Sequence, residues 1–167
     1  LLFVYLSFFL KLLWVRCPKN LNRINMKNKE LDWRIWNKDD SVEERTYSRA
    51  SGDLPEMESA KQLREIIGNI SQNESILDVG CAAGHYLRSI RQLNSSCNYT
   101  GVDATVKYID SAIKLHQADS NAKFVNGDIY SLKFKADIVF CCNVLLHLPD
   151  LKAPLENLLN SFNKKLI

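Results

Sequence analysis

The chain has 167 residues, of which 46% are hydrophobic and 25% are charged, a balance typical of one soluble globular domain with a real core. The formal net charge of +3 would suit a nucleic-acid or membrane partner, but four of the 22 basic residues precede Met26 and no acidic residue does. From Met26 onward the acidic residues outnumber the basic ones by one, so charge does not indicate binding to nucleic acid.

The five cysteines point to a reducing compartment. They are an odd number, no pair has the C-x-x-C spacing, and two are adjacent within an apolar run (Cys17, Cys81, Cys97, Cys141 and Cys142). We interpret them as buried free thiols rather than a disulfide framework or a zinc site, and we expect a cytoplasmic protein without a bound metal.

The N-terminal segment is almost wholly apolar over residues 1–15, with Lys11 as its only charge. It is shorter than the roughly 20 residues of a membrane-spanning helix. Three interpretations stay open: the remnant of a membrane anchor, the remnant of a signal peptide, or sequence translated upstream of a true start at Met26. We favour the third, and expect membrane contact only if residues 1–15 are a genuine anchor. The predicted organisation is a leader over residues 1–25, an arm over residues 26–54 and a domain over residues 55–167.

The arm and the start of the domain differ in periodicity. Residues 27–53 show no clear period and predict an irregular arm with short helical turns. A helix is expected from Pro55, because proline suits a first turn and apolar residues then recur at spacings of three or four. The stripe that they form consists of Met57, Ala60, Leu63, Ile67 and Ile70.

Four short apolar runs alternate with helical patterns in the rest of the chain, at residues 76–79, 99–102, 123–126 and 138–142. Continuous rather than alternating apolar character indicates strands of a parallel sheet that is covered on both faces. Right-handed crossovers then favour an α/β fold with a Rossmann-like, doubly wound, mostly parallel sheet in three α/β/α layers.

The later helical patterns complete this prediction. In the helix expected over residues 106–118, we place Val106, Ile109 and Ile113 on the inner side. A last amphipathic helix is expected over residues 150–165, after which the chain stops. The sequence therefore predicts a sheet that is incomplete at its C-terminus. If these residues are the whole protein, the fourth strand is an exposed edge, and we favour instead a fragment of a longer protein.

Candidate ligand-binding residues follow the predicted strands, because a doubly wound sheet binds its ligand beyond the carboxyl ends of the strands. Asp78 and the small residues of the Gly80–Gly84 loop follow the first strand, and this loop would let a ligand lie against backbone N–H groups. The residues at the other strand ends are Asp103, the pair Asp128 and Ile129, and the run from Asn143 to His147.

Four short segments resemble the motifs of the class I S-adenosylmethionine-dependent methyltransferases. They are Ile76–Gly84, Thr100–Asp103, Asn126–Ile129 and Ala136–Leu148. Each alone is a weak signal, but four in order at family-like spacing make a strong match over residues 74–149. The first segment departs from the family at Ala82, where relatives often have glycine.

This resemblance implies that the chain binds S-adenosylmethionine and transfers its methyl group. It places the methionine part on the glycine loop, the ribose at Asp103 and the adenine at Asp128, with the backbone of Asn143 near the methionine end. Tyr47 and Arg49 resemble a capping segment of the family, in which Arg49 would pair with the methionine carboxylate. The implied cofactor-binding residues are Tyr47, Arg49, Asp78, Gly80, Cys81, Ala82, Gly84, Asp103, Ala104, Asp128, Ile129 and Asn143.

His147 is the candidate catalytic residue, because an imidazole that titrates near neutral pH can deprotonate an oxygen or nitrogen acceptor. A sulfonium methyl is already activated, so its transfer needs mainly alignment of the reactants and exclusion of water. Asp78 is expected to orient the loop rather than to touch the ligand. His85 and His116 are expected at the surface or in loops, without partners.

Two other functions stay open. A nicotinamide-dependent oxidoreductase also uses a glycine loop and a later acid, although this loop lacks the third glycine of G-x-G-x-x-G. A non-catalytic binding fragment would follow from the missing C-terminal strands. The default acceptor is a small molecule because the domain lacks a basic stripe; tRNA, protein and lipid are further options, and the oligomeric state is left open.

Overall fold

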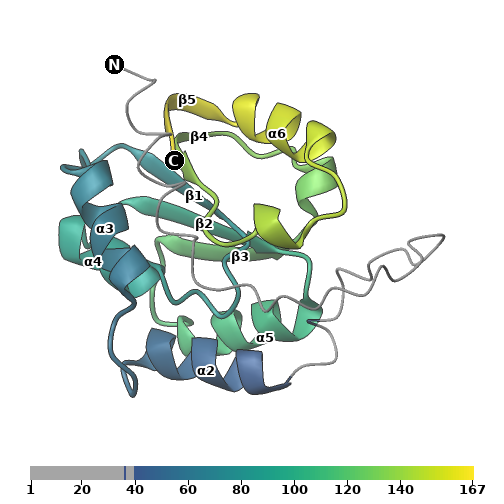
Figure 1. The fold of residues 1–167 in the computed structure, drawn as a ribbon. Coiled ribbons are helices and arrows are strands. Elements are labelled where there is room, and N and C mark those ends of the chain that lie inside the picture. Colours follow the sequence, from purple (N-terminus) through teal and green to yellow (C-terminus); the bar gives the residue numbers. More distant parts are fainter. Residues whose placement is uncertain (1–35, 37–39) are drawn as a thin grey trace, which may run out of the picture. The chain divides into compact units, whose positions relative to one another are not determined.

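The computed structural model describes Trp36 and residues 40–167, which contain a five-stranded parallel sheet with strand order β3-β2-β1-β4-β5 (Figure 1). The strands are β1 Ser75–Val79, β2 Asn98–Asp103, β3 Ala122–Asn126, β4 Ala136–Phe140 and β5 Phe162–Leu166. Strand order reverses between β1 and β4, which both pair with parallel neighbours. The predicted Rossmann-like α/β fold is confirmed. The expectations for residues 1–25, including the start at Met26, lie outside the described residues.

Helices cover both faces of this sheet. They are α2 Asp40–Ser51, α3 Glu58–Ile67, α4 Leu87–Leu93, α5 Val106–Leu115 and α6 Lys152–Leu159, with 3-10 turns η2 Ile129–Ser131 and η3 Leu145–His147. In Figure 1, α2 lies beside α5. Within the described part of the chain, no helix is both long enough and apolar enough to cross a membrane.

Two hydrophobic clusters explain why the strands have continuous runs of apolar residues. Ile76 belongs to the cluster that α3, α4 and α5 form on one face, and Leu77 belongs to the cluster with Ile129 and Leu158 on the other. Because successive strand residues point to opposite faces, both faces must be apolar where both are covered. The predicted apolar stripe is confirmed at Ala60, Leu63 and Ile67, which are all buried in the first cluster, but the helix begins at Glu58 and not at Pro55. The result is three α/β/α layers.

The sequence prediction was wrong at the C-terminal end of the chain. The last helix does not continue to Lys165: α6 ends at Leu159, and residues 162–166 form β5, a parallel neighbour of β4. The backbone N–H of Ala136 donates to the carbonyl of Ser161, and that of Cys141 donates to the carbonyl of Ile167. β4 is therefore not an exposed edge. Apolar residues at helical spacing hid a short strand that pairing with β4 stabilises.

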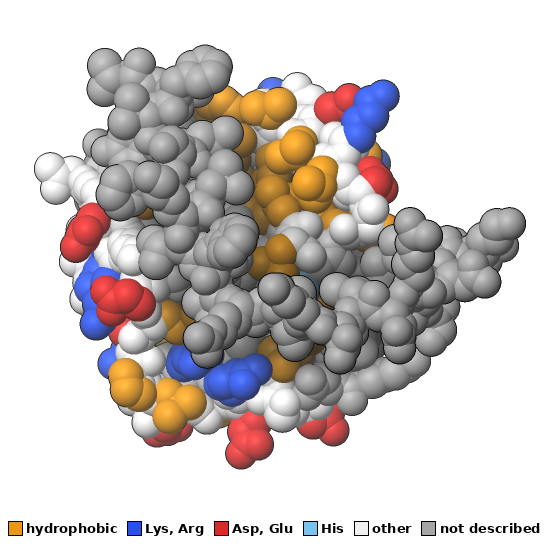
Figure 2. Space-filling model, in the orientation of Figure 1, with side chains coloured by type: hydrophobic (Ala, Val, Ile, Leu, Met, Phe, Trp, Pro, Cys, Tyr) orange, Lys and Arg blue, Asp and Glu red, His pale blue; other side chains and the backbone are white. Residues whose placement is uncertain are grey.

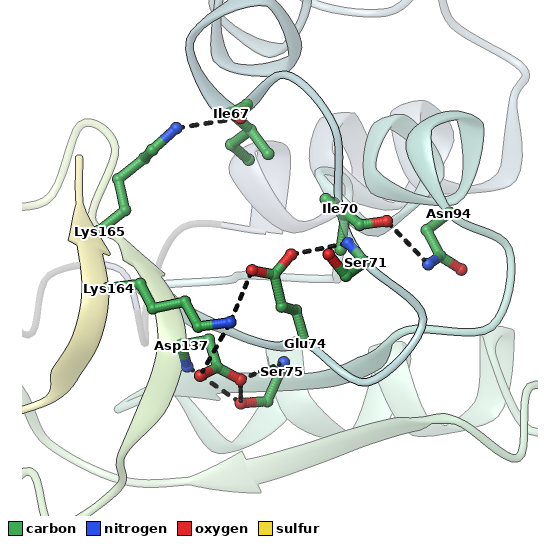
Figure 3. A network of polar contacts seen from close by, with 9 residues as sticks. All are labelled: Ile67, Ile70, Ser71, Glu74, Ser75, Asn94, Asp137, Lys164 and Lys165. Atoms are coloured by element: carbon green, nitrogen blue, oxygen red, sulfur yellow. Dashed lines mark hydrogen bonds and ion pairs between the residues drawn. The ribbon is translucent and has the colours of Figure 1, made fainter.

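Polar contacts fasten β5 to the amino-terminal end of the sheet (Figure 3). The Lys165 ammonium donates to the carbonyls of Ile66 and Ile67 at 3.1 and 3.0 Å, where the last carbonyls of α3 lack partners within their own helix. The neighbouring Lys164 forms an ion pair with Glu74 at 2.9 Å. These two lysines tie the last strand to the segment that precedes β1.

Two helix predictions also need correction. The segment expected to be an irregular arm contains α2, a helix of 12 residues. In α5 the buried residues are Tyr108, Ile109 and Ala112, whereas Val106 and Ile113 are 57% and 49% exposed. The buried face is thus rotated from the predicted one. Because apolar residues recur at helical spacing on both faces, periodicity alone does not show which face is buried.

The last helix is less buried than its apolar sequence suggests. Leu158 and Pro154 face the core, but Leu151, which precedes α6, and Leu155 and Leu159 within it are exposed. Figure 2 shows hydrophobic side chains gathered over α6 on this face of the molecule.

Candidate functional site

A cavity of about 310 Å³ lies beyond the carboxyl ends of the strands. Its walls come from the loop after β1, the ends of β2 and β3, the segment after β4, and α2. This is the position where a doubly wound sheet binds ligands, beside the reversal of strand order. The predicted residues that line it are Arg49, Gly80, Ala82, Asp103, Ala104, Asp128, Ile129, Asn143 and His147.

The loop after β1 approaches the cavity with its backbone. Gly80 has φ +84°, and a Cβ atom at this position would collide with Cγ2 of Val144. Glycine is therefore required here on two counts, conformation and space. Ala82 has φ +48°, a left-handed conformation that costs an alanine roughly 1–2 kcal/mol. The local strain lies at the position where the resembling family often has glycine.

Asp103 joins the end of β2 to this loop. Its Oδ2 accepts from the N–H of Ala82 at 2.9 Å, and its Oδ1 accepts from the N–H of Thr105 at 2.8 Å. Burial raises the pKa of Asp103, and the two backbone hydrogen bonds oppose that rise. Each carboxylate oxygen keeps a lone pair for a ligand hydroxyl, because a carboxylate offers about four acceptor positions.

The segment after β3 supplies an acid beside an apolar residue. Asp128 lines the cavity and accepts from the N–H of Tyr130 at 3.0 Å, which fixes the start of η2. Ile129 also lines the cavity and is 6% exposed, and its carbonyl accepts from Asn157 at 2.8 Å. This pair presents one hydrogen-bond acceptor and one apolar side chain to a ligand in the cavity.

The segment after β4 brings Asn143 and His147 to the cavity. Asn143 has φ +60°, an uncommon backbone conformation that asparagine tolerates better than most residues. The His147 ring lies edge-on to Trp36, with centroids 4.8 Å apart. Burial lowers the pKa of His147, so its imidazole is neutral at pH 7 and is able to accept a proton.

Four predicted residues do not line the cavity, namely Tyr47, Asp78, Cys81 and Gly84. Asp78 is buried, and its Oδ2 accepts from the Tyr99 hydroxyl at 2.5 Å. Its expected role of orienting the loop stays a prediction. Burial raises the pKa of Asp78 to about 8. The described cysteines, Cys81, Cys97, Cys141 and Cys142, are free, and Cys17 lies outside the described residues.

Two histidines lie in turns, as expected, but both are half-buried against aromatic rings, and sequence reasoning missed part of α2. His85 lines the cavity beside Tyr86, with ring centroids 4.3 Å apart. His116 stacks on Phe124 at 5.3 Å, and a Cβ atom on Gly84 would lie 3.0 Å from its Nε2, so it packs behind the loop. Thr46 and Met57 line the cavity as well. The position of His85 directly after the glycine loop was a signal that could have identified it.

The cavity suits a nucleoside-like cofactor with a charged tail. Such sites are concave and mostly apolar, with a few polar groups that fix orientation. Here Asp103 and Asp128 supply acceptors, Ile129 supplies apolar contact, and Arg49 supplies a positive charge. Because Gly80 has no side chain, the backbone there is open to a ligand. Among the described residues, no group of His, Cys, Asp or Glu side chains is arranged to hold a metal ion.

Comparison with known proteins gives one consistent result. A family model described as "Methyltransferase domain" matches residues 70–167. A ubiquinone biosynthesis O-methyltransferase of Hydrogenovibrio crunogenus is 34% identical over 101 residues, which are 56% of this chain and 38% of the relative. A tRNA (guanine-N(7)-)-methyltransferase of Prochlorococcus marinus is 32% identical over 80 residues, or 47% of this chain and 38% of the relative.

A solved structure with the same fold is an S-adenosylmethionine-dependent methyltransferase from Aquifex aeolicus, with a TM-score of 0.60 and 17% identity over 75% of this chain and 68% of that one. The chain thus spans a little over a third of the two curated relatives. The family match favours a methyltransferase over a nicotinamide-dependent oxidoreductase. β5 supplies one of the strands whose expected absence suggested the non-catalytic alternative.

Proposed function

The chain belongs to the family of class I S-adenosylmethionine-dependent methyltransferases, and on that premise we propose that it transfers a methyl group from S-adenosylmethionine to a small-molecule acceptor. The observation that supports this most is the convergence of three strand ends and the glycine loop on one cavity that holds Asp103, Asp128 and Arg49. The cofactor supplies an activated methyl group on a sulfonium, and the protein binds and aligns the reactants.

The proposed binding roles follow from the chemistry of each wall. Asp103 accepts the ribose hydroxyls, for which its two oxygens still have lone pairs beyond their backbone partners. Asp128 accepts from the adenine amine while Ile129 lies on the ring. The loop from Gly80 to Ala82 holds the methionine part against backbone, and Arg49 pairs with its carboxylate.

The proposed catalytic contribution is mainly positional. Holding the acceptor atom, the methyl carbon and the leaving sulfur on one line converts a bimolecular displacement into a step within one complex, an effect worth about 7–11 kcal/mol. His147 faces the same cavity as a neutral imidazole and takes the proton of an oxygen or nitrogen acceptor. Trp36 and Leu148 beside it give the acceptor an apolar surface and help to exclude water.

The proposal of a small acceptor is supported by the walls of the cavity and by the balance of charge. Side chains of α2 form one wall, so the acceptor must fit between α2 and the strand ends. Residues from Met26 onward carry no excess of basic side chains, unlike a typical nucleic-acid surface. By their names, one of the two curated relatives is an O-methyltransferase of ubiquinone biosynthesis and the other methylates tRNA. A tRNA acceptor must therefore be tested beside a small molecule.

The direct test is calorimetric titration of the full chain with S-adenosylhomocysteine and, separately, with reduced nicotinamide dinucleotide. We expect saturable one-to-one binding of the first and none of the second. Tight binding of the nicotinamide alone would overturn the proposal. The acceptor class is tested by incubating the protein with labelled S-adenosylmethionine and either a small-molecule fraction or total tRNA, and label on the tRNA alone would contradict a small acceptor.

A further inference from the structure

His85 contributes a polar side chain to the wall of the cavity. It directly follows the Gly80–Gly84 loop and lines the cavity. Its Nδ1 atom is buried, and no described residue forms a hydrogen bond with it. A buried nitrogen without a partner is costly, commonly about 1–3 kcal/mol, so its retention in a ligand cavity calls for an explanation.

The ring of His85 is held in place by its neighbours. Tyr86 lies under it, and the Tyr86 hydroxyl is hydrogen-bonded to Ser59 at 3.0 Å. Tyr86 also meets Phe140 edge to face, with centroids 5.6 Å apart. The turn before it is closed by the N–H of Gly84, which donates to the carbonyl of Cys81 at 2.9 Å. His85 is thus placed by both the core and the loop.

The imidazole of His85 is neutral at pH 7. Burial, with a smaller contribution from the positive charge of Arg49, lowers the pKa of His85 to about 4. A neutral imidazole has one nitrogen with a free lone pair, which accepts a hydrogen bond. Beside the Arg49 guanidinium, which offers only donors, His85 gives this end of the cavity both a cation and an acceptor.

A cation and an acceptor side by side match the carboxylate and the ammonium group of an α-amino acid. We propose that His85 and Arg49 together recognise the amino-acid end of the cofactor, with the α-ammonium donating to Nδ1 of His85 and the α-carboxylate pairing with Arg49. The inference rests on the proposed function, because it takes the loop next to His85 to hold the methionine part. It assigns a binding role to a residue that the sequence motifs leave unassigned.

Truncated ligands test this assignment without any need for turnover. The dissociation constants of S-adenosylhomocysteine, its deaminated analogue and 5′-methylthioadenosine, which lacks the amino-acid end, are measured by calorimetry. His85→Leu removes the acceptor, and His85→Asn keeps an acceptor oxygen near the position of Nδ1. Thermal unfolding of each variant is recorded alongside.

We expect His85→Leu to weaken S-adenosylhomocysteine about tenfold or more, the usual value of a hydrogen bond to a charged group, and to change the other two ligands less than twofold. His85→Asn should restore most of the lost affinity. Equal weakening of all three ligands, or no weakening of any, would overturn the role of His85. If the unaltered protein binds none of them, the proposed function itself fails, which is a different result.

Discussion

Oδ2 of Asp103 and the backbone N–H of Ala82 are 2.9 Å apart and form a hydrogen bond that ties the end of β2 to the loop after β1. The same carboxylate holds Thr105 at the start of α5 through Oδ1. Asp103 therefore shapes the floor of the cavity whether or not a ligand is bound. Because Asp103 holds the loop and is proposed to bind the ribose, a change in this residue should alter both the loop geometry and the affinity for the cofactor.

Replacement of Asp103 is predicted to weaken cofactor binding. In Asp103→Ala the ribose hydroxyls lose their acceptor and two backbone N–H groups lose theirs, so we expect the affinity for S-adenosylhomocysteine to fall about tenfold to a hundredfold. Calorimetry measures the change, with the exposed Asp110→Ala as the matched control. Unchanged affinity in a folded Asp103→Ala would remove this residue from the binding site.

Gly80→Ala is predicted to be far more damaging to ligand binding than the same change at Gly68. Both glycines have positive φ, and Gly68, with ψ −131°, lies in a region that alanine avoids, so both variants are expected to lose stability. Only at Gly80 does the added methyl collide, with Val144, whereas nothing lies within 4 Å of the corresponding position at Gly68. Ligand titration should show loss of binding for Gly80→Ala alone, while urea unfolding records the loss of stability of each variant. Equal losses of binding would mean that the Val144 contact is unimportant.

The buried Asp78 predicts an unusual pH dependence of stability. Its pKa is raised to about 8 in the folded protein, so between pH 4 and pH 8 the folded state holds a proton that the unfolded chain has released. This contribution to the free energy of unfolding is fully present below about pH 4 and is lost as the pH rises through 8.

Asp78→Asn resembles the protonated carboxyl and should therefore flatten the dependence. Urea unfolding of both proteins at several pH values from 6.5 to 8.5 gives the comparison, since the lowered pKa of His85 acts only below this range. Parallel curves for the two proteins would show that Asp78 is ionised in the fold.

The lysines of β5 are predicted to differ in their contribution to stability. Lys165 donates to two carbonyls at the end of α3, and Lys165→Met should cost about 1–2 kcal/mol of unfolding free energy. The ion pair between Lys164 and Glu74 is more exposed, and Lys164→Met should cost less than Lys165→Met. Chemical denaturation distinguishes them, and a larger effect at Lys164 would contradict the contacts in Figure 3.

The strands near the centre of the sheet were predictable because they are covered on both faces. Ile76 and Leu77 serve opposite hydrophobic clusters, which leaves an uninterrupted apolar run in the sequence. β5 has no such run, since its central residues are Asn163, Lys164 and Lys165. Its strand state depends on pairing with β4, a tertiary contact that local periodicity does not contain.

The site was predictable where a short motif places a residue at the end of a strand. Asp103, Asp128 and Asn143 follow apolar runs directly, and all three line the cavity. Thr46 and Met57 belong to segments far from the motifs, and only the packing of α2 and α3 brings them to the cavity. The environment of His85 is equally tertiary, because the charge of Arg49, which lowers its pKa, comes from the distant helix α2.

The most direct test of the central claim is an amide NMR titration of the protein with S-adenosylhomocysteine. We predict that the resonances of Ala82, Asp103, Ile129 and Asn143 shift together with one midpoint, while those of Leu159 and Lys164 stay in place. Shifts confined to a different face of the molecule, or no shifts at saturating ligand, would contradict a single adenosyl-binding cavity at the carboxyl ends of the strands.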